Sequence, residues 1–300
     1  MGHAEPTNAA ELEGAVERVR RLCSDFMVGE ILHRTEKSLL LAGTVQNEQV
    51  VAKVLLDETA FWREKFRQEI AAYRYFRKQL PPFKIPRLLQ ADVASAVLLI
   101  RHVPGRPLAV QRYPQEPLPQ TDLDIALGAI ESVDSWKASL KAPFQRVVDY
   151  PARLDRYRDY GVLDERDHSL LSSVVRRQDE SWWTFCHGDP LLSNFLLSGN
   201  ECVLVDWEFA GFFLQGFDLA MLWVLLYSTP AARDRIRDII RRTGEKGETL
   251  FLVNLAVVLT REIRIHRELP PAPTRDALLA TLWEDWTAVR GEIRAAFGGA

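Results

Sequence analysis

Five polar residues within one short segment are the strongest candidates for chemistry in this chain. Residues 185–218 read FCHGDPLLSNFLLSGNECVLVDWEFAGFFLQGFD and contain His187, Asp189, Asn194, Asp206 and Asp218. Carboxylate and amide oxygens are the ligands that Mg²⁺ prefers. A carboxylate can also orient a hydroxyl group and take its proton. We therefore expect Asn194 and Asp206 to hold Mg²⁺, and Asp189 to act on the hydroxyl of an acceptor.

The apolar runs between these residues predict how they are positioned. Residues 195–197 and 203–205 are short apolar runs joined by Ser-Gly-Asn, the pattern of two buried strands and a turn. A hairpin would bring Asn194, before its first strand, close to Asp206, after its second. An ordinary surface loop is the alternative, because Asp and Asn are common in turns. The ordered set of five residues favours the site.

The motif resembles that of a known enzyme superfamily. HGDPLLSN followed by VDWE is similar to the catalytic loop and metal-binding aspartate of the aminoglycoside phosphotransferase and choline kinase superfamily, small-molecule relatives of protein kinases. Protein kinases have H-R-D-x-x-x-x-N and a later Asp-Phe-Gly. Here Gly188 replaces the arginine, and Trp207-Glu208 replaces Phe-Gly. Both departures point to the small-molecule branch.

The resemblance, which covers about residues 26–225, implies a fold, cofactors and roles. The fold would be α+β and bilobal, like a protein kinase, with an antiparallel five-stranded sheet plus helix in the N-terminal lobe and a mostly helical C-terminal lobe. The cofactors would be ATP and Mg²⁺. His187 and Asp218 would support the catalytic loop, and Asp218 would also cap a helix.

A lysine and a glutamate in the N-terminal part each interrupt an apolar pattern. Three strands are expected at 26–32, 38–45 and 49–56, and Lys53 lies inside the third. A helix is expected over 58–80, where Glu69 interrupts an apolar face formed by Trp62, Phe66, Tyr73 and Phe76. Each charge would be costly to bury alone, so a Lys53–Glu69 pair is expected. Alternatively, Lys53 extends to solvent and Glu69 marks the edge of the face. The resemblance implies that the pair positions the ATP phosphates.

The remaining nucleotide contacts have weaker patterns. Strands are expected at 86–91 and 96–102, and Pro104-Gly105 suggests a linker. We expect an N-terminal nucleotide-binding lobe over 1–100, a hinge over 101–106 and a C-terminal lobe over 107–300. The resemblance implies that adenine contacts the backbone at Ile100, His102 and Val103. The turn at 33–38 lacks G-x-G-x-x-G, so Ser38 is a candidate phosphate contact and a plain surface hairpin remains the alternative.

The C-terminal part is expected to be helical and to bind the acceptor. Helices are expected at 121–140, 169–178, 217–228, 230–243, 247–268 and 275–296, with a further N-terminal helix at 11–22 and an irregular stretch at 141–167. By the resemblance, the candidate acceptor contacts besides Asp189 are Glu208, Arg261, Glu262, Arg264, His266, Glu284 and Asp285. The stretch TREIRIHRE is more basic than acidic. This disfavours a polycationic aminoglycoside, which needs many carboxylates.

Composition indicates an ordinary globular protein. The 300 residues are 47% hydrophobic and 26% charged, with a net charge of −3 that offers no basic field for nucleic acid or acidic membranes. Three cysteines without metal-ligand spacing suggest buried free thiols and a reducing cytoplasm. The first residues lack the pattern of a signal peptide, and no run of 18 apolar residues predicts a membrane span. The oligomeric state is left open.

Together these features predict an ATP- and Mg²⁺-dependent phosphotransferase. It would move the γ-phosphate of ATP to a hydroxyl of a small molecule, such as an antibiotic, an amino sugar or another metabolite. The alternative is a nucleotide-binding regulator with little catalysis, which only the weak phosphate turn favours. Intact Asp189, Asn194 and Asp206 argue against that alternative. A protein kinase is disfavoured because 206–218 is too short for an activation loop.

Overall fold

A computed structural model of the chain describes residues 9–139, 142–177 and 179–298, and these form two compact units. The described residues up to Leu108, together with Ala138–Phe144 and Asn194–Ala210, make up the first unit. The second unit contains Ala109–Lys137, Gln145–Ser193 and the described residues from Gly211 onward. The predicted division into lobes at a linker over 101–106 stays a prediction, since the first unit continues through Leu108 and takes in two later segments.

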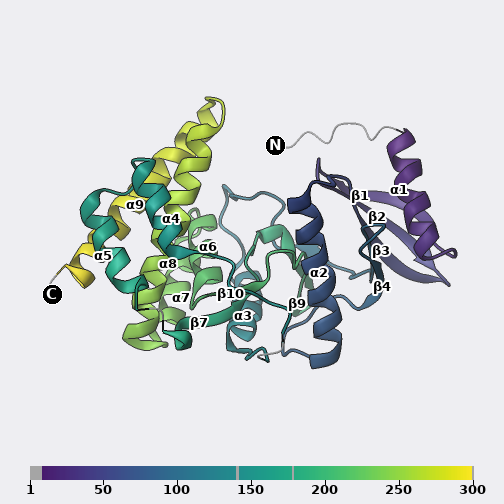
Figure 1. Cartoon of the computed structure of the whole chain (residues 1–300), viewed down its shortest axis with the longest axis horizontal. Helices are drawn as coiled ribbons and strands as arrows, with labels where there is room; N and C mark the ends of the chain where they lie inside the picture. The colour runs from purple at the N-terminus through teal and green to yellow at the C-terminus, as the bar shows by residue number, and fades with distance from the viewer. Residues whose placement is uncertain (1–8, 140–141, 178, 299–300) are drawn as a thin grey trace. The chain divides into compact units, whose positions relative to one another are not determined.

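An antiparallel five-stranded sheet organises the first unit, as predicted (Figure 1). Its strand order is β1-β2-β3-β5-β4. The strands are β1 (Met27–Arg34), β2 (Ser38–Val45), β3 (Glu48–Leu55), β4 (Leu88–Asp92) and β5 (Val97–Arg101). Gln46 and Asn47 join β2 to β3 with φ of 50° and 67°. Positive φ at both central residues matches the right-handed twist of a tight hairpin, which fixes the register of β3.

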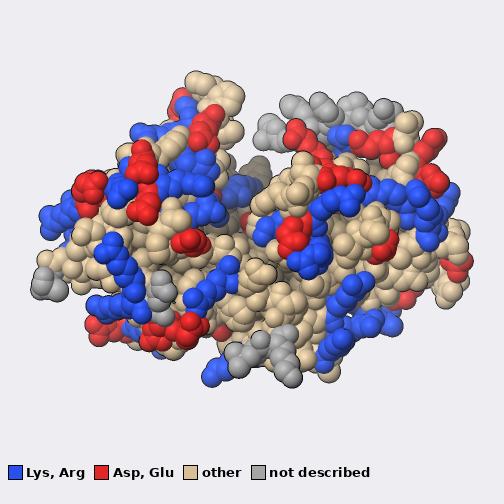
Figure 2. Space-filling model, in the orientation of Figure 1, with Lys and Arg blue, Asp and Glu red and all other residues tan. Residues whose placement is uncertain are grey.

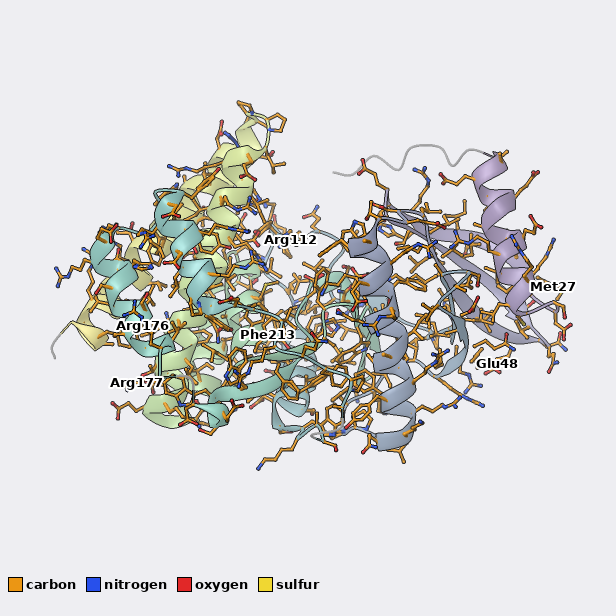
Figure 3. The ribbon with its side chains drawn as sticks, in the orientation of Figure 1. Met27, Glu48, Arg112, Arg176, Arg177 and Phe213 are labelled. Atoms are coloured by element: carbon orange, nitrogen blue, oxygen red, sulfur yellow. The ribbon has the colours of Figure 1, made fainter. Side chains whose placement is uncertain are left out.

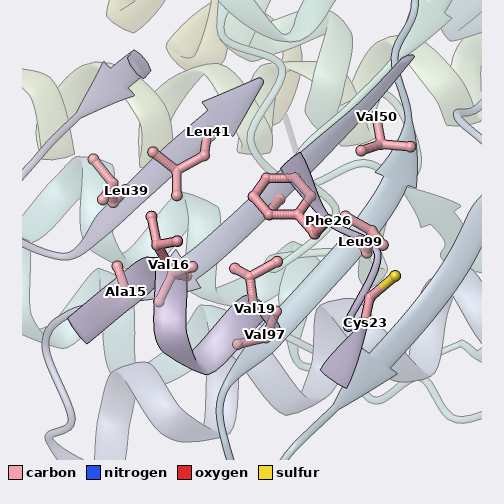
Figure 4. Close-up of a cluster of buried hydrophobic side chains, with 12 residues drawn as sticks. Ala15, Val16, Val19, Cys23, Phe26, Leu39, Leu41, Val50, Val97 and Leu99 are labelled. Carbon is pink, nitrogen blue, oxygen red and sulfur yellow. The ribbon is translucent and has the colours of Figure 1, made fainter. Parts of the chain in front are cut away.

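Two helices belong to the same unit. Helix α1 (Ala9–Leu22) packs Ala15, Val16 and Val19 against buried side chains of the sheet (Figure 4). Helix α2 (Ala60–Gln79) buries Phe66, Glu69, Ile70, Ala72, Tyr73 and Phe76. That set follows the helical period, so the expected apolar face is present and Glu69 lies in it. Helix α2 ends at Leu80, which has φ 47°.

A smaller sheet in the first unit carries the end of the motif. It has the order β6-β8-β9, with β6 (Arg106–Pro107), β8 (Phe195–Ser198) and β9 (Glu201–Leu204). The β8–β9 hairpin is the one expected from the two apolar runs, whereas the two-residue β6 was not expected. Trp207 follows the hairpin fully buried, stacked on Phe83 and edge-on to Phe76. This aromatic packing fixes the chain between Asp206 and Glu208.

The second unit is mostly helical, as predicted. Its helices are α3 (Gln120–Ser135), α4 (Tyr150–Asp159), α5 (Glu165–Val175), α6 (Phe217–Leu225), α7 (Pro230–Arg241), α8 (Gly244–Glu268) and α9 (Pro273–Phe297). The antiparallel pair β7 (Trp183–Cys186) and β10 (Gly211–Leu214) lies among them. Two 3₁₀ turns complete the elements, η1 (Glu180–Trp182) and η2 (Leu192–Asn194). The last residue of η2, Asn194, already belongs to the Asn194–Ala210 segment of the first unit. Figure 3 labels Phe213 on β10, a strand that the sequence did not predict.

The expectation of an irregular stretch at 141–167 is wrong. Helix α4 and the start of α5 lie there, and the side chains of Asp149 and Asp164 cap them by accepting the N–H groups of Ala152 and Asp167. Helix α4 escaped notice because only Tyr150, Leu154 and Tyr157 of its ten residues are buried. Two expected helix ends, Leu140 and Gln178, lie outside the described residues.

The surface and the cysteines agree with the compositional expectations. Basic and acidic side chains are interspersed on the face shown in Figure 2, so neither sign dominates it. Cys23, Cys186 and Cys202 are buried free thiols. Within the described ranges, we find no helix with both the length and the apolar composition to cross a bilayer.

Candidate functional site

Lys53 is the centre of a buried charged cluster in the first unit. Its Nζ lies 2.7 Å from Glu69 Oε2, 2.6 Å from Asp206 Oδ1 and 3.3 Å from Glu208 Oε2. Lys53 projects from the middle of β3 and Glu69 from the buried face of α2, so the sheet and the helix hold the two together. The expected Lys53–Glu69 pair is therefore present, and Lys53 does not extend to solvent.

A second lysine joins this cluster and was not foreseen. Lys37 Nζ lies 2.6 Å from Glu208 Oε1 and 4.8 Å from the centre of the Trp62 ring. Glu208 is only 3% exposed and contacts both lysines, so the structure places it in this cluster. It was expected among the acceptor contacts because a sequence does not show which way a buried glutamate points. Lys37, in the 33–38 turn, was the sequence feature that could have suggested this ion pair.

The electrostatics of the cluster favour charged lysine. Burial by itself would lower the pKa of Lys53, but Asp206, Glu69 and Glu208 raise it well above its ordinary value. Burial raises the pKa of Glu69, and Lys53 opposes that shift. Three carboxyl groups thus share the two ammonium groups of Lys53 and Lys37.

The carboxylates of the cluster also fit a divalent cation. Oxygens of Glu69, Asp206 and Glu208 lie within 4.8 Å of one another. Asp206 has φ 66°, a left-handed conformation that is uncommon outside glycine and is found at functional sites. The Asn194 carbonyl accepts the N–H of Val205 at 3.1 Å. Both expected metal ligands therefore stand at the same end of the β8–β9 hairpin.

The remaining nucleotide candidates occupy the turn before β2 and the end of β5. Ser38 is buried, and its hydroxyl lies 3.4 Å from that of Thr35, whose N–H also bonds the Ser38 carbonyl. Ile100 pairs with β3 and β4 within the sheet. The His102 N–H donates to the Gln49 carbonyl at 3.0 Å, so that amide is used by the fold. The expected adenine contacts stay a prediction.

In the second unit, Asp218 holds the backbone of the HGD loop. Its carboxylate accepts the N–H of His187 at 2.7 Å and that of Gly188 at 2.9 Å. Burial raises the pKa of Asp218 to about 7, against the lowering effect of these two bonds. The expectation that Asp218 caps a helix is wrong, because Gly216 is the N-cap of α6 and Asp218 lies inside the first turn.

Asp189 is half-buried at the tip of this loop. Its N–H lies 3.4 Å from His187 Nδ1, and its carbonyl accepts the N–H of Leu191 at 2.7 Å. His187 is fully buried, so the ring and the Asp218 carboxylate fix the loop from two sides. The positive charge of Arg112 also acts on Asp189. The loop can therefore present a carboxylate in a fixed direction.

The acceptor candidates on α8 form a second charged cluster. Glu262 is 1% exposed, accepts the hydroxyl of Tyr113 at 2.5 Å and bonds Arg112 and Arg261. Burial would raise its pKa, but Arg261 and Arg112 outweigh burial and hold it at about 2. Arg112 and Tyr113 were missed, since they lie in a proline-rich stretch whose partner on α8 is about 150 residues away.

The other acceptor candidates divide into buried and exposed groups. The buried His266 ring contacts the Glu262 carbonyl through Nδ1 at 2.8 Å and the Tyr113 ring edge-on at 5.5 Å. It therefore supports the Glu262 cluster from within the unit. Asp285 is bound by both terminal nitrogens of Arg233, and Arg264 pairs with Glu268. Glu284 is exposed.

Comparison with known proteins identifies the family. A sequence model described as "Phosphotransferase enzyme family" matches residues 43–250, which is more than half of the chain. The chain belongs to the phosphotransferase enzyme family. The resemblance that the catalytic motif suggested is thereby confirmed, and so is the kinase-like α+β fold.

Solved structures of this family share the fold at low identity. A thermostable mutant of aminoglycoside phosphotransferase APH(4)-Ia has a TM-score of 0.58 at 14% identity, covering 94% of this chain and 98% of that one. Choline kinase LicA from Streptococcus pneumoniae has a TM-score of 0.56 at 12% identity, covering 92% and 99%. At such identities the likeness shows the fold alone.

One curated relative is similar over a shorter stretch. Choline kinase B1 of Caenorhabditis elegans is 36% identical over 69 residues, which are 22% of this chain and 16% of that protein. The match thus spans less than two thirds of that relative. Its activity and substrate are not carried over by the match.

Proposed function

We propose that this member of the phosphotransferase family is a small-molecule kinase that transfers the γ-phosphate of ATP to an acceptor hydroxyl. The observation that supports this proposal is the buried Lys53–Glu69–Asp206–Glu208 cluster together with the HGD loop held by Asp218. Family relatives solved with nucleotide support it: an amicoumacin kinase was determined with AMP-PNP and Ca²⁺ and an APH(4)-Ia variant with AMP-PNP and hygromycin B.

The roles follow from the chemistry of each group. Asp189 would orient the acceptor hydroxyl and take its proton as the new O–P bond forms and the bond to the ADP leaving oxygen breaks. Lys53, held by Glu69, would bind phosphate oxygens. The peptides of Ile100, His102 and Val103 would contact adenine, and Ser38 the phosphates.

The carboxylates of the first unit would hold the metal. Asp206 and Asn194 supply hard oxygen ligands, which fit Mg²⁺. A bound Mg²⁺ neutralises charge that develops on the phosphates. Lys53 would then exchange part of its carboxylate contacts for phosphate, because the metal would take up the Asp206 carboxylate that Lys53 contacts.

The test is ADP release with Mg²⁺-ATP over a panel of hydroxylated acceptors. Asp189→Asn should lower kcat by about 10²- to 10⁴-fold, the usual contribution of a general base. Asp206→Ala should lower turnover by at least about a hundredfold. The matched control is Asp238→Ala, which removes a carboxylate paired with Arg241 on the exposed face of α7.

Two results would decide against the proposal. An Asp206→Ala enzyme with normal acceptor-dependent turnover would overturn the assigned metal site. Mg²⁺-ATP binding by the wild type without turnover on any acceptor would favour a nucleotide-binding regulator instead.

A further inference from the structure

The Glu262 cluster holds more positive charge than it needs to neutralise its own carboxylate. Both Arg112 and Arg261 bond Glu262 Oε1, at 3.0 and 2.7 Å, while the Tyr113 hydroxyl bonds Oε2. With a pKa of about 2, Glu262 carries one negative charge at neutral pH, against two guanidinium groups. Arg112, Arg261 and Glu262 together therefore carry one positive charge, and the carboxylate of Asp189, which also acts on Arg112, lies outside this count.

Arg112 is the member of the cluster that solvent reaches. Its side chain is 38% exposed, against 25% for Arg261 and 1% for Glu262. Figure 3 labels it on the segment that precedes α3. Its contacts with Glu262 and with the Tyr113 ring at 5.8 Å fix the guanidinium in place. A fixed, partly exposed guanidinium is suited to bidentate recognition of a carboxylate or a phosphate.

The charge of Arg112 acts close to the proposed base. Asp189 is among the charges that raise the pKa of Arg112, after the larger effects of burial, which lowers it, and of Glu262. An anionic group held by Arg112 would therefore lie in the neighbourhood of Asp189. Such a group is complementary in charge to the Arg112 guanidinium.

Two tryptophan rings of this unit are already covered by guanidinium groups. A quaternary or primary ammonium is usually held over aromatic rings. Here Arg233 lies 3.8 Å and Arg237 5.3 Å from the centre of the Trp223 ring, and Arg267 lies 5.2 Å from that of Trp283. These rings already stack with guanidinium groups of the protein.

We propose that the acceptor is an anionic hydroxyl compound whose carboxylate or phosphate is bound by Arg112, with Arg261 and Glu262 positioning that guanidinium. This inference rests on the proposed kinase function and names its substrate class. Tyr113 and His266 support the cluster from the buried side. The acceptor hydroxyl would be directed to Asp189 while its anionic end stays on Arg112.

The experiment compares acceptors that differ only in the anionic group. ADP release would be measured with glycerate beside its neutral amide, with L-serine and L-homoserine beside their amides, which lose the carboxylate and keep the ammonium group, and with glycerol 3-phosphate beside glycerol. Choline and an aminoglycoside are the cationic acceptors. We expect turnover for the members that carry a carboxylate or a phosphate, and the carboxylate and phosphate pairs distinguish the two sources of negative charge.

Variants then assign the anion to Arg112. Arg112→Gln should raise the acceptor KM about 10- to 100-fold, the effect of losing a charge-assisted hydrogen bond, and leave the KM for ATP unchanged. Arg112→Lys should restore part of the loss. Arg237→Gln is the matched control, since Arg237 is bidentate to Glu292 in the same unit and has no proposed role.

The outcomes separate this inference from the function on which it rests. Turnover of neutral or cationic acceptors alone, or an unchanged KM for the anionic acceptor in Arg112→Gln, overturns the inference and leaves the kinase function standing. Absence of turnover on the whole panel counts against the kinase function, and the inference falls with it. Loss of ATP affinity in Arg112→Gln would likewise contradict a role in acceptor binding.

Discussion

At the scale of single residues, the ammonium group of Lys53 is the shared partner of the carboxylates in the first unit's charged cluster. Lys53 contacts three carboxylates, and two of them, Glu69 and Glu208, have side chains only 2% and 4% exposed. Buried carboxylates without a partner are strongly destabilising, while paired ones contribute little net stability. The members of the cluster therefore have unequal importance for folding.

Lys53→Met should destabilise the protein more than Glu69→Gln. The first change leaves three carboxylates with Lys37 as the remaining ammonium and should cost about 3–5 kcal/mol. The second leaves Lys53 with two carboxylate partners and should cost about 1–3 kcal/mol. Urea denaturation midpoints measure both. Equal losses of stability in the two variants would mean that Glu69 is the only carboxylate whose pairing with Lys53 matters for folding.

Asp218 should make stability depend on pH. Its pKa of about 7 in the folded state exceeds the usual value near 4, so the native protein holds a proton that the unfolded chain releases. The stability that this proton contributes is complete below about pH 4 and is lost as pH rises through 7. The free energy of unfolding of the wild type should therefore fall relative to Asp218→Asn between pH 4.5 and 7.5. A constant difference over that range would indicate an ordinary pKa.

At the scale of elements, the start of α6 positions the HGD loop. Gly216 begins the helix with φ 84°, and the carboxylate of Asp218, two residues later, bonds the loop backbone. A Cβ atom added to Gly216 would lie 3.1 Å from Ile240 Cδ1. The left-handed conformation favours glycine here, and the Ile240 side chain would have to shift slightly to admit a Cβ.

Gly216→Ala should lower both stability and kcat. The left-handed conformation costs an L-residue about 1–2 kcal/mol, and the contact with Ile240 adds to this. Gly161→Ala is the matched control, because Gly161 has φ 75° and nothing within 4 Å of its Cβ position. The control should lose about 1 kcal/mol and keep its kcat. Equal kcat in the two variants would show that α6 does not position the loop.

At the scale of the whole molecule, each unit carries part of the motif. Asp189 and Asp218 belong to the second unit, while Lys53, Asn194 and Asp206 belong to the first. Ligands that bind only the native protein stabilise it by mass action, whichever unit they contact. Nucleotide binding should therefore appear as a change in thermal stability.

Mg²⁺-AMP-PNP at about 100 times its Kd should stabilise the protein by about 2.7 kcal/mol. That corresponds to a rise in Tm of about 4 °C for a protein of 300 residues. Removing the metal with EDTA should abolish most of the rise, because the carboxylates would then repel the phosphates. Asp206→Ala should show the same loss in a thermal melt. A full rise in EDTA would contradict the metal site.

The sequence alone determined the family, the fold class and the Lys53–Glu69 pair. The motif at 187–206 is local, and both charged residues interrupt apolar patterns whose period follows from strand and helix geometry. The five-stranded sheet was predictable for the same reason. Helix α4 was not, because its buried face has only three residues and its caps resemble loop residues.

Only the tertiary structure decided which charges meet across long sequence separations. Lys37 and Glu208 are 171 residues apart, and Arg112 and Glu262 are 150 apart. Periodicity shows which face of an element is buried, but the partner of a buried charge depends on how elements pack. Glu208 lies between Trp207 and Phe209, and Glu262 lies between Arg261 and Ile263. In the folded protein, Glu208 contacts lysines of the first unit and Glu262 contacts arginines of the second.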